Sequence, residues 1–345
     1  MTAPGITAQA VADLVGGRLL GDGEVVLRGV GPLDRAGPET LSFAVADRYA
    51  GELRATQAGA VLLPTALADA PAGCRARIVV ADPYGALAEA IRRMYPAIPP
   101  APGVDPTARI GAGSHLGRDV TIGPFTVLGR GVRLGDRCRV AEGVSLGDGV
   151  VVGEDSVIGP RVVCYAGSRM GRRVVLKAGA VIGGDGFGYL SGASGHTRIP
   201  HVGGCILEDD VEIGSNSTVD RGSVDDTVIG QGSKLDNLVH VGHNVRVGAR
   251  CLLMAFVGVA GSTRVGDGAI LAGHVGVTDH LTIGAGARVA AKSAVFGDVE
   301  PGSVISGHPA RPNRQFLRAQ AALYRLAPII SEVERLVAGE GRRND

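Results

Sequence analysis

The sequence is poor in aromatic side chains, in net charge and in long apolar runs. It has no tryptophan, and only six tyrosines and six phenylalanines occur among 345 residues. Basic and acidic residues nearly cancel to a net charge of +1, so no basic tract indicates nucleic-acid binding. No apolar run approaches the roughly 20 residues of a membrane span, and residues 1–5 do not resemble a signal peptide. We therefore expect a cytoplasmic chain with no transmembrane segment.

The cysteines also lack the spacing of a disulfide framework or a zinc knuckle. Five occur far apart, and no two form a CxxC pair; they are Cys74, Cys138, Cys164, Cys205 and Cys251. This pattern favours free thiols in a reducing compartment. We expect no metal and no cofactor.

Glycine is abundant, with 55 residues, and a six-residue repeat explains its use. From Ile110 an aliphatic side chain, usually followed by glycine, recurs at every sixth position to Ile182, and again from Ile229 to Val295. A period of six fits neither a helix nor an alternating strand. It is typical of a parallel β-helix, in which three hexapeptides form one triangular coil. We predict this fold for residues 102–309, with the aliphatic side chains inside and the glycines relieving crowding at the corners.

The repeat breaks twice, at residues 183–206 and 220–228. Insertions in a solenoid become loops, often on the binding side. The first insertion carries Phe187 and Tyr189 in an otherwise aromatic-poor chain, which favours a functional loop. It is not a P-loop, because no GKS or GKT follows the glycines.

The two ends lack the repeat. Residues 1–101 predict a small α/β domain, with helices over residues 6–14 and 86–95 and strands over residues 25–27, 60–63 and 78–80. Residues 96–102 predict a stiff proline-rich linker. Residues 310–345 predict a helix that Pro328 should kink or split. Its arginines, Arg314, Arg318 and Arg325, suit an acidic partner protein.

Four histidines gather in the second half of the repeat, namely His240, His243, His274 and His280. Because aliphatic residues occupy the inward positions, these histidines should face outward. His243 and His280 are 37 residues apart, two coils of eighteen plus one, so they should share an edge at about 10 Å. A histidine there could be the base of an acyl transfer, with a backbone N–H holding the oxyanion. Histidines from adjacent subunits could instead bind Zn²⁺, as in carbonic anhydrases of this fold.

Several motifs resemble one family over nearly the whole chain. They are GDGFGY at residues 184–189, IPHVG at 199–203, VEIG at 211–214, TVDRG at 218–222, DDT at 225–227, DNLVHVGHN at 236–244 and SGHP at 306–309. Together they resemble the UDP-3-O-acylglucosamine N-acyltransferases of lipid A assembly. The resemblance implies a homotrimeric left-handed parallel β-helix with sites at subunit interfaces. It also implies transfer of a (3R)-3-hydroxyacyl group from acyl carrier protein to the 2-amine of UDP-3-O-acylglucosamine.

The resemblance also implies roles for particular residues. His243 would be the general base, His280 a second active-site histidine, and the N–H of Gly261 the oxyanion donor. Phe43 and Tyr49 would sandwich the uracil, and the C-terminal helix would help dock acyl carrier protein. Asp236 would hold the amine or sugar near His243. The other substrate-binding residues would be Asp185, Phe187, Tyr189, Asn237 and Asn244.

The chain departs from that family at a few positions. Ala46 stands where asparagine is frequent, and His201 and His240 stand where glutamine is common. Small residues at Ala290, Ala291 and Ala294 suggest a groove with room for a long acyl chain. Three alternatives remain at this stage: O-acyl transfer to UDP-N-acetylglucosamine, a zinc carbonic anhydrase, and a solenoid without an active site. The division of roles between His243 and His280, and any part for His240, also stays open.

Overall fold

The computed structural model describes residues 5–96, 100–307 and 312–340. The chain divides into two compact units at Pro100. None of the helices in these described ranges is long and apolar enough to cross a membrane.

The first unit is a five-stranded sheet with helices on both faces. The sheet order is β2-β7-β6-β5-β4, and only the β2–β7 pair is antiparallel. One face packs on α1 and α3 through side chains such as Leu62 and Ile78, and the other packs near α2 through Val61 and Leu63. The elements are β1 (Ile6–Thr7), α1 (Ala8–Leu14), β2 (Arg18–Gly21), β3 (Val26–Leu27), β4 (Gly29–Val30), β5 (Thr40–Phe43), α2 (Ala50–Ala55), β6 (Ala60–Pro64), β7 (Ala76–Val80) and α3 (Pro83–Met94).

Local capping sets the helix starts in this unit. The Thr7 hydroxyl accepts from the N–H of Ala10, and the Asp82 carboxylate accepts from the N–H of Tyr84. The predicted first helix begins two residues late, because Ile6 and Thr7 pair with β3 instead. The sequence analysis also missed β2, β4 and β5.

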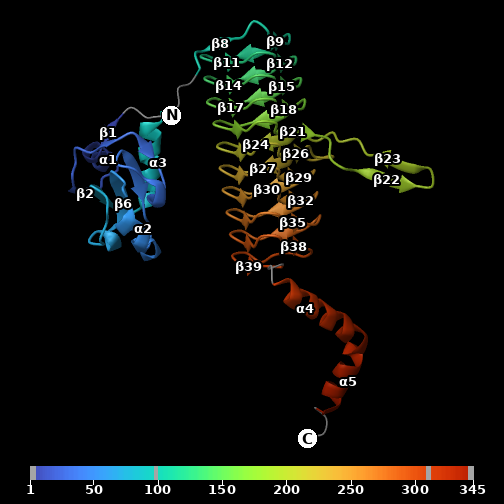
Figure 1. Cartoon of the computed structure of the whole chain (residues 1–345). Helices are drawn as coiled ribbons and strands as arrows, with labels where there is room; N and C mark the ends of the chain where they lie inside the picture. Colours follow the sequence, from blue (N-terminus) through green and yellow to red (C-terminus); the bar gives the residue numbers. More distant parts are fainter. Residues whose placement is uncertain (1–4, 97–99, 308–311, 341–345) are drawn as a thin grey trace. The chain divides into compact units, whose positions relative to one another are not determined.

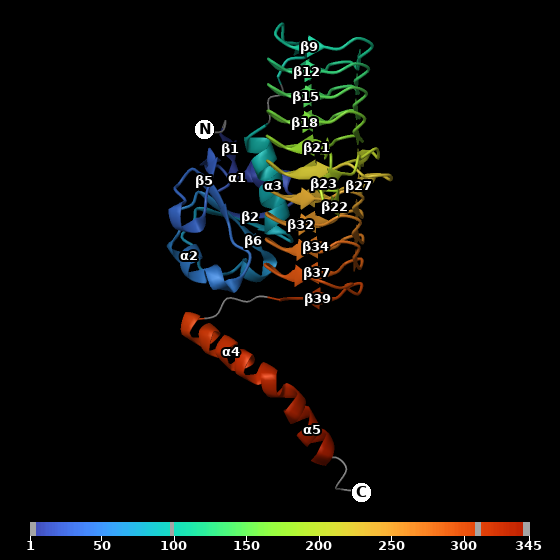
Figure 2. The same ribbon diagram turned by 90° about the vertical axis from the view of Figure 1, so that its right-hand side faces the viewer.

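The second unit is a parallel β-solenoid, as the hexapeptide repeat predicts (Figures 1 and 2). Strands pair with partners eighteen residues away, as in Thr121 with Arg139, which is one triangular coil of three hexapeptides. We name the three sheets face 1, face 2 and face 3 in the order in which the chain visits them, and each corner by the faces it joins.

The strands of each face follow in chain order. Face 1 comprises β8 (Gly103–Val104), β11 (Thr121–Ile122), β14 (Arg139–Val140), β17 (Val157–Ile158), β20 (Val175–Leu176), β25 (Glu212–Ile213), β28 (Lys234–Leu235), β31 (Leu252–Leu253), β34 (Ile270–Leu271), β37 (Arg288–Val289) and β39 (Val304–Ile305). Face 2 comprises β9 (Arg109–Ile110), β12 (Val127–Leu128), β15 (Ser145–Leu146), β18 (Val163–Cys164), β21 (Val181–Gly184), β26 (Thr218–Asp220), β29 (His240–Val241), β32 (Gly258–Val259), β35 (Gly276–Val277) and β38 (Ala294–Val295). Face 3 comprises β10 (His115–Leu116), β13 (Arg133–Leu134), β16 (Val151–Val152), β19 (Arg169–Met170), β24 (Cys205–Leu207), β27 (Thr227–Ile229), β30 (Arg246–Val247), β33 (Arg264–Val265) and β36 (Thr282–Ile283).

Stacked aliphatic side chains fill the prism and form one continuous core. The glycine after the aliphatic residue is needed because the next coil lies directly against it. A Cβ on Gly117 would lie 2.6 Å from the backbone of Gly135, and one on Gly135 would lie 2.5 Å from the backbone of Glu154. Glycine at this position thus allows the coils to stack at strand spacing.

The two breaks in the repeat are insertions at the corner between faces 2 and 3. Strand partners there are 37 residues apart, as in Val181 with Thr218, and then 22 apart, as in Thr218 with His240. The first insertion forms an antiparallel hairpin, β22 (Tyr189–Gly192) and β23 (Gly195–Arg198), which projects from the solenoid (Figure 1). The sequence predicted a loop here, and the structure shows strand pairing within it.

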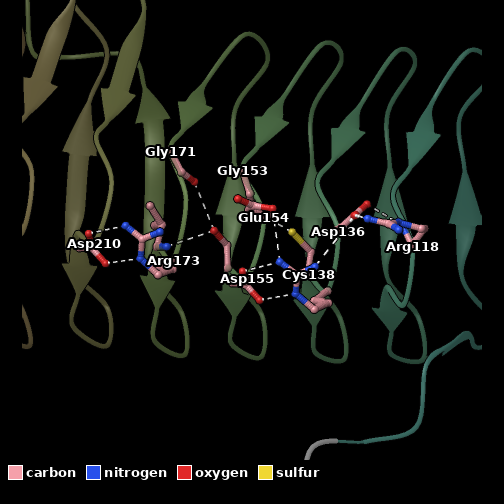
Figure 3. Close-up of polar contacts among 12 residues, drawn as sticks. Arg118, Asp136, Cys138, Gly153, Glu154, Asp155, Gly171, Arg173 and Asp210 are labelled. Carbon is pink, nitrogen blue, oxygen red and sulfur yellow. Dashed lines mark hydrogen bonds and ion pairs between the residues drawn. The ribbon is translucent and has the colours of Figure 1, made fainter.

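Ion pairs link successive coils along the corner between faces 3 and 1 (Figure 3). A guanidinium nitrogen of each arginine lies 2.6–2.7 Å from a carboxylate oxygen of an aspartate in the following coil. The pairs are Arg118 with Asp136, Arg137 with Asp155, and Arg173 with Asp210. The Cys138 thiol and the Ser156 hydroxyl donate to the carbonyls of Gly153 and Gly171, also one coil ahead. Side chains therefore reinforce the coil stacking that the backbone ladders establish.

The C-terminal segment is helical with a break at the expected proline. Helix α4 (Asn313–Leu326) and helix α5 (Ile330–Glu340) are joined by a short 3₁₀ turn over Ala327–Ile329. Pro328 lies in this turn, where its missing N–H and its ring interrupt the helix.

Candidate functional site

His243 lies in the turn after β29, at the corner where both insertions leave the solenoid. Its ring Nδ1 is 2.9 Å from the side-chain oxygen of Asn244. The same oxygen accepts from the N–H of Ser223 at 3.0 Å and from the Ser223 hydroxyl at 2.7 Å. The Asn244 amide nitrogen donates to the carbonyl of Asp225 at 3.0 Å.

These contacts determine which nitrogen of His243 is free. The Ser223 N–H can only donate and the Asp225 carbonyl can only accept, so the orientation of the Asn244 amide is fixed. Its oxygen therefore faces His243, and in the neutral imidazole Nδ1 must carry the proton. The other ring nitrogen, Nε2, then has a free lone pair, as a general base requires.

Glycines allow the His243 ring to pack closely. A Cβ on Gly261 would lie 2.7 Å from Cε1 and 2.8 Å from Nε2 of His243. A Cβ on Gly186 would lie 2.8 Å from the Cβ of His243 and 3.0 Å from Nε2 of His201. The His201 ring lies edge-on to the His243 ring with centroids 5.3 Å apart. Only 7% of His201 is exposed, its Nδ1 lies 3.0 Å from the Ile199 carbonyl, and its Nε2 has no partner among the described residues.

Two cavities meet at His243 and Phe187, which line both. The first, of about 600 Å³, lies beneath the hairpin and is also lined by Tyr189, Ser191, His196 and Ser223. The second, of about 630 Å³, runs along the outside of face 2 towards Phe296.

The second cavity exists because side chains become small along face 2. The outward positions in register are Val181, Thr218, His240, Gly258, Gly276 and Ala294. At the same level face 3 carries Arg246, Arg264 and Thr282, and face 1 carries Leu252, Ile270 and Arg288. We call the row of Gly258, Gly276 and Ala294 the trough. Ala290 and Ala291 do not line it.

His280 and Asp279 edge the trough two coils beyond His243. The N–H of His280 donates to the carbonyl of Gly261 at 3.1 Å, and its Nδ1 lies 3.0 Å from Asp279 Oδ2. This hydrogen bond lowers the pKa of Asp279. The N–H of Gly261 has no hydrogen-bond acceptor within the described part of the chain.

Asp220, the last residue of β26, also lines the second cavity. Burial raises its pKa, and the neighbouring His240, His243 and His201 oppose that rise. The His240 Nε2 lies 3.9 Å from Asp220 Oδ2, and the His240 Nδ1 lies 2.8 Å from the Thr218 hydroxyl. Asp220 belongs to the TVDRG motif, but its sequence position alone indicates no role for it.

The remaining loop residues have separate partners. Asp185 forms an ion pair with Arg198 at the base of the hairpin. The rings of Phe187 and Tyr189 contact each other, with centroids 5.0 Å apart, and Phe187 is 86% exposed.

Asp236 and Asn237 lie at a different corner from His243 in the same chain. They follow β28 at the corner between faces 1 and 2, whereas His243 follows β29 at the next corner. The Asn237 oxygen accepts from the N–H of Ser215, and neither residue lines the two cavities. His274 is also at this corner, stacked on Phe256 at 4.5 Å. Within one chain, the structure does not bring these residues to His243.

The predicted uracil-binding residues lie in the first unit. The rings of Phe43 and Tyr84 contact each other, with centroids 5.2 Å apart. The Cζ of Arg48 lies 4.9 Å from the ring centroid of Tyr49. Tyr84 is an exposed aromatic side chain that the sequence analysis did not single out. Arg314, Arg318 and Arg325 all lie on α4. Part of the SGHP motif, His308 and Pro309, lies outside the described residues.

No group of three or more histidine, cysteine or acidic side chains in the described ranges of this chain could hold a metal ion. The pair of His274 and His280 lies on adjacent corners.

Comparison with known proteins identifies the family. A family model described as UDP-3-O-(3-hydroxymyristoyl) glucosamine N-acyltransferase, LpxD, matches residues 24–93, and bacterial hexapeptide-repeat models match residues 113–148, 149–183 and 226–261. A UDP-3-O-acylglucosamine N-acyltransferase of Granulibacter bethesdensis is 51% identical, over 92% of this chain and 93% of that protein. The enzyme of the same name from Syntrophotalea carbinolica is 51% identical, over 96% and 95%.

Among solved structures, a UDP-N-acetylglucosamine O-acyltransferase from Moraxella catarrhalis is 23% identical. The likeness has a TM-score of 0.48 and covers 69% of this chain and 93% of that one. The 51% identity over 92–96% of this chain shows that the chain belongs to the UDP-3-O-acylglucosamine N-acyltransferase family.

Proposed function

We propose that this protein transfers a (3R)-3-hydroxyacyl group from acyl carrier protein to the 2-amine of UDP-3-O-(3-hydroxyacyl)-glucosamine, in the cytoplasmic assembly of lipid A. The names of its relatives supply the acceptor. The observation that carries the proposal is the fixed His243 imidazole, with Nε2 free at the head of an apolar trough.

The chemistry follows from this arrangement. His243 Nε2 takes the proton from the attacking nitrogen as the N–C bond forms, and returns it to the sulfur as the thioester C–S bond breaks. The N–H of Gly261 is free to stabilise the developing oxyanion, and His280 lies further along the same cavity. The trough accepts the acyl chain, because small side chains on three successive coils leave its floor open.

The remaining site residues fit a site completed by another copy of the chain. Asp236 and Asn237 lie at the wrong corner to meet His243 of their own chain, so we assign them to the site of a neighbour in a homotrimer. The same corner exposes Leu238, Met254 and Phe256, and Leu252 is exposed on the adjoining face 1; a neighbouring subunit would cover these apolar side chains. Asp185, Phe187, Tyr189 and Asn244 border the sugar on the His243 side, and Phe43 and Tyr49 bind the uracil.

A transfer assay tests the proposal. Purified full-length protein is supplied with 3-hydroxyacyl-acyl carrier protein and either UDP-3-O-acylglucosamine or UDP-N-acetylglucosamine. We expect the N-acyl product from the first sugar, and a loss of about 100-fold or more in kcat for His243→Ala. His115→Ala, an exposed histidine on face 3, serves as the control and should keep full activity. Product from UDP-N-acetylglucosamine alone would establish O-acyl transfer instead, and no product from either would leave only the fold in common.

A further inference from the structure

Acylation of an amine leaves one proton that acylation of a hydroxyl does not. An acceptor that arrives as an ammonium ion carries three protons. One stays on the amide nitrogen, and one passes through His243 to the departing sulfur, which leaves with the electron pair of the C–S bond. The third must leave the site altogether. A hydroxyl acceptor has only one proton, which the departing sulfur takes, so nothing remains to be removed.

The site contains a carboxylate suited to an ammonium ion. Asp220 lines the same cavity as His243, and 15% of its side chain is exposed. Among the described residues, its only ion-pair partner within 4 Å is His240, which is a cation only when protonated. By contrast, Asp185 already pairs with Arg198, and Asp136 and Asp155 at the corner between faces 3 and 1 already pair with Arg118 and Arg137. Asp220 is therefore free to pair with an incoming cation.

His240 connects this carboxylate to solvent. Its Nε2 lies 3.9 Å from Asp220 Oδ2, about 1 Å beyond a hydrogen bond, while Thr218 holds its Nδ1. The His240 side chain is 55% exposed, so a proton it accepts can pass to water. The other titratable groups around Asp220 are His243, His201, Asp185 and the buried thiol of Cys205.

We propose that Asp220 binds the ammonium group of the acceptor, and that Asp220 and His240 together carry its surplus proton to solvent while His243 moves the proton from nitrogen to sulfur. The inference rests on the proposed function, and it makes Asp220 the residue that favours an amine over a hydroxyl acceptor.

Binding tests the first half without requiring turnover. Two UDP sugars that differ only in a 2-amine or a 2-hydroxyl are titrated calorimetrically into the full-length protein at pH 6.5. We expect the amine to bind about 10-fold more tightly than the hydroxyl compound, the effect of one partly buried ion pair. Asp220→Asn should abolish this preference by weakening the amine alone. Asp209→Asn, which breaks an ion pair with Arg172 at the corner between faces 3 and 1, is the matched control and should leave the preference intact.

Equal binding of the two sugars by the wild type would overturn the assignment. Equal weakening of both sugars by Asp220→Asn would assign the residue to the fold or to the neutral sugar. If the wild type binds the amine selectively but forms no amide, the proposed reaction fails while the role of Asp220 in binding stands.

The pH profile of transfer tests the proton exit. Asp220→Asn should lower kcat/KM by about 100-fold at pH 6.5, and the loss should shrink at alkaline pH, where the acceptor amine is already neutral in solution. His240→Gln should lower kcat at pH 6.5 with little change in KM, and should likewise recover at alkaline pH. Losses of the same size at every pH would refute the relay, because a structural defect does not recover when the substrate loses its proton.

Discussion

At the scale of single residues, the central fact is a hydrogen-bond chain that fixes one imidazole. Two backbone groups orient Asn244, and Asn244 in turn places the proton of His243 on Nδ1. The local sequence of histidine followed by asparagine does not reveal these hydrogen bonds, because Ser223 and Asp225 come from the second insertion, about twenty residues earlier.

From this series of hydrogen bonds we predict that Asn244 is a positioning residue. Asn244→Ala should lower kcat by about 10- to 100-fold, because His243 loses the partner that holds its tautomer. Asn244→Asp, which keeps an acceptor oxygen for Nδ1, should retain more activity than the alanine variant. Steady-state kinetics of both variants, with melting curves to check folding, measure the effect. Equal activity of alanine variant and wild type would show that His243 needs no such orientation.

At the scale of elements, face 2 is distinguished by small side chains at its outward positions. Gly258 and Gly276 have no atom near the position of a Cβ, so larger side chains fit the fold there. The absence of larger side chains opens the trough. At the same level, the outward positions carry Arg246, Arg264 and Thr282 on face 3, and Leu252, Ile270 and Arg288 on face 1.

Filling the trough should therefore change specificity while leaving the fold intact. Gly276→Val is expected to lower transfer of long acyl chains by about 10-fold or more relative to short ones. The valine suits a strand and meets no neighbour, so the melting temperature should hardly change. A series of acyl carrier protein thioesters of increasing chain length measures the ratio, with Thr282→Val on face 3 as the control. An unchanged ratio would place the acyl chain elsewhere.

The row of ion pairs at the corner between faces 3 and 1 should make the stability of the solenoid sensitive to acid. Hydrogen bonds from Arg137 and Arg173 hold the pKa values of Asp155 and Asp210 below their ordinary range. Because these pKa values are depressed on folding, the stabilisation is present above the unfolded value of about 3.9 and is lost as the pH falls through the folded values.

Melting temperatures between pH 7 and pH 3 should show this loss. The double variant Asp155→Asn with Asp210→Asn should melt somewhat below the wild type at pH 7, and the difference should narrow towards pH 3. High salt should also narrow the difference at pH 7, because exposed pairs are screened. A constant difference at all pH values would show that the pairs act through shape and not through charge.

At the scale of the whole molecule, three parts contribute to one proposed reaction. The solenoid carries the proposed base, His243, and the trough, the first unit carries the aromatic side chains proposed for uracil, and α4 carries three arginines.

The arginines of α4 should act on the protein donor alone. Replacing Arg314, Arg318 and Arg325 together by glutamate should raise KM for acyl-acyl carrier protein by about 10-fold or more and remove its dependence on salt. The kcat at saturating donor should stay close to that of the wild type, because α4 contributes no group to the His243 cavities. Arg335→Glu on α5 is the control. A fall in kcat with unchanged KM would contradict a docking role.

The sequence by itself determined the solenoid and its place in the chain. A six-residue period can be read directly from the sequence, because every coil repeats the same packing: each aliphatic residue and each glycine packs against the next coil. The break at Pro328 was likewise predictable from the sequence, whereas the sheet of the first unit, in which Arg18 of β2 pairs with Val79 of β7, was found only in part.

Tertiary structure decided how the site is assembled. Only the folded coil shows that Asp220 lies beside His240, and that Ser223 and Asp225 of the second insertion orient Asn244. The physical reason is that two insertions shift the strand spacing from eighteen to 37 and 22 residues, so neighbours across coils cannot be counted from the repeat alone.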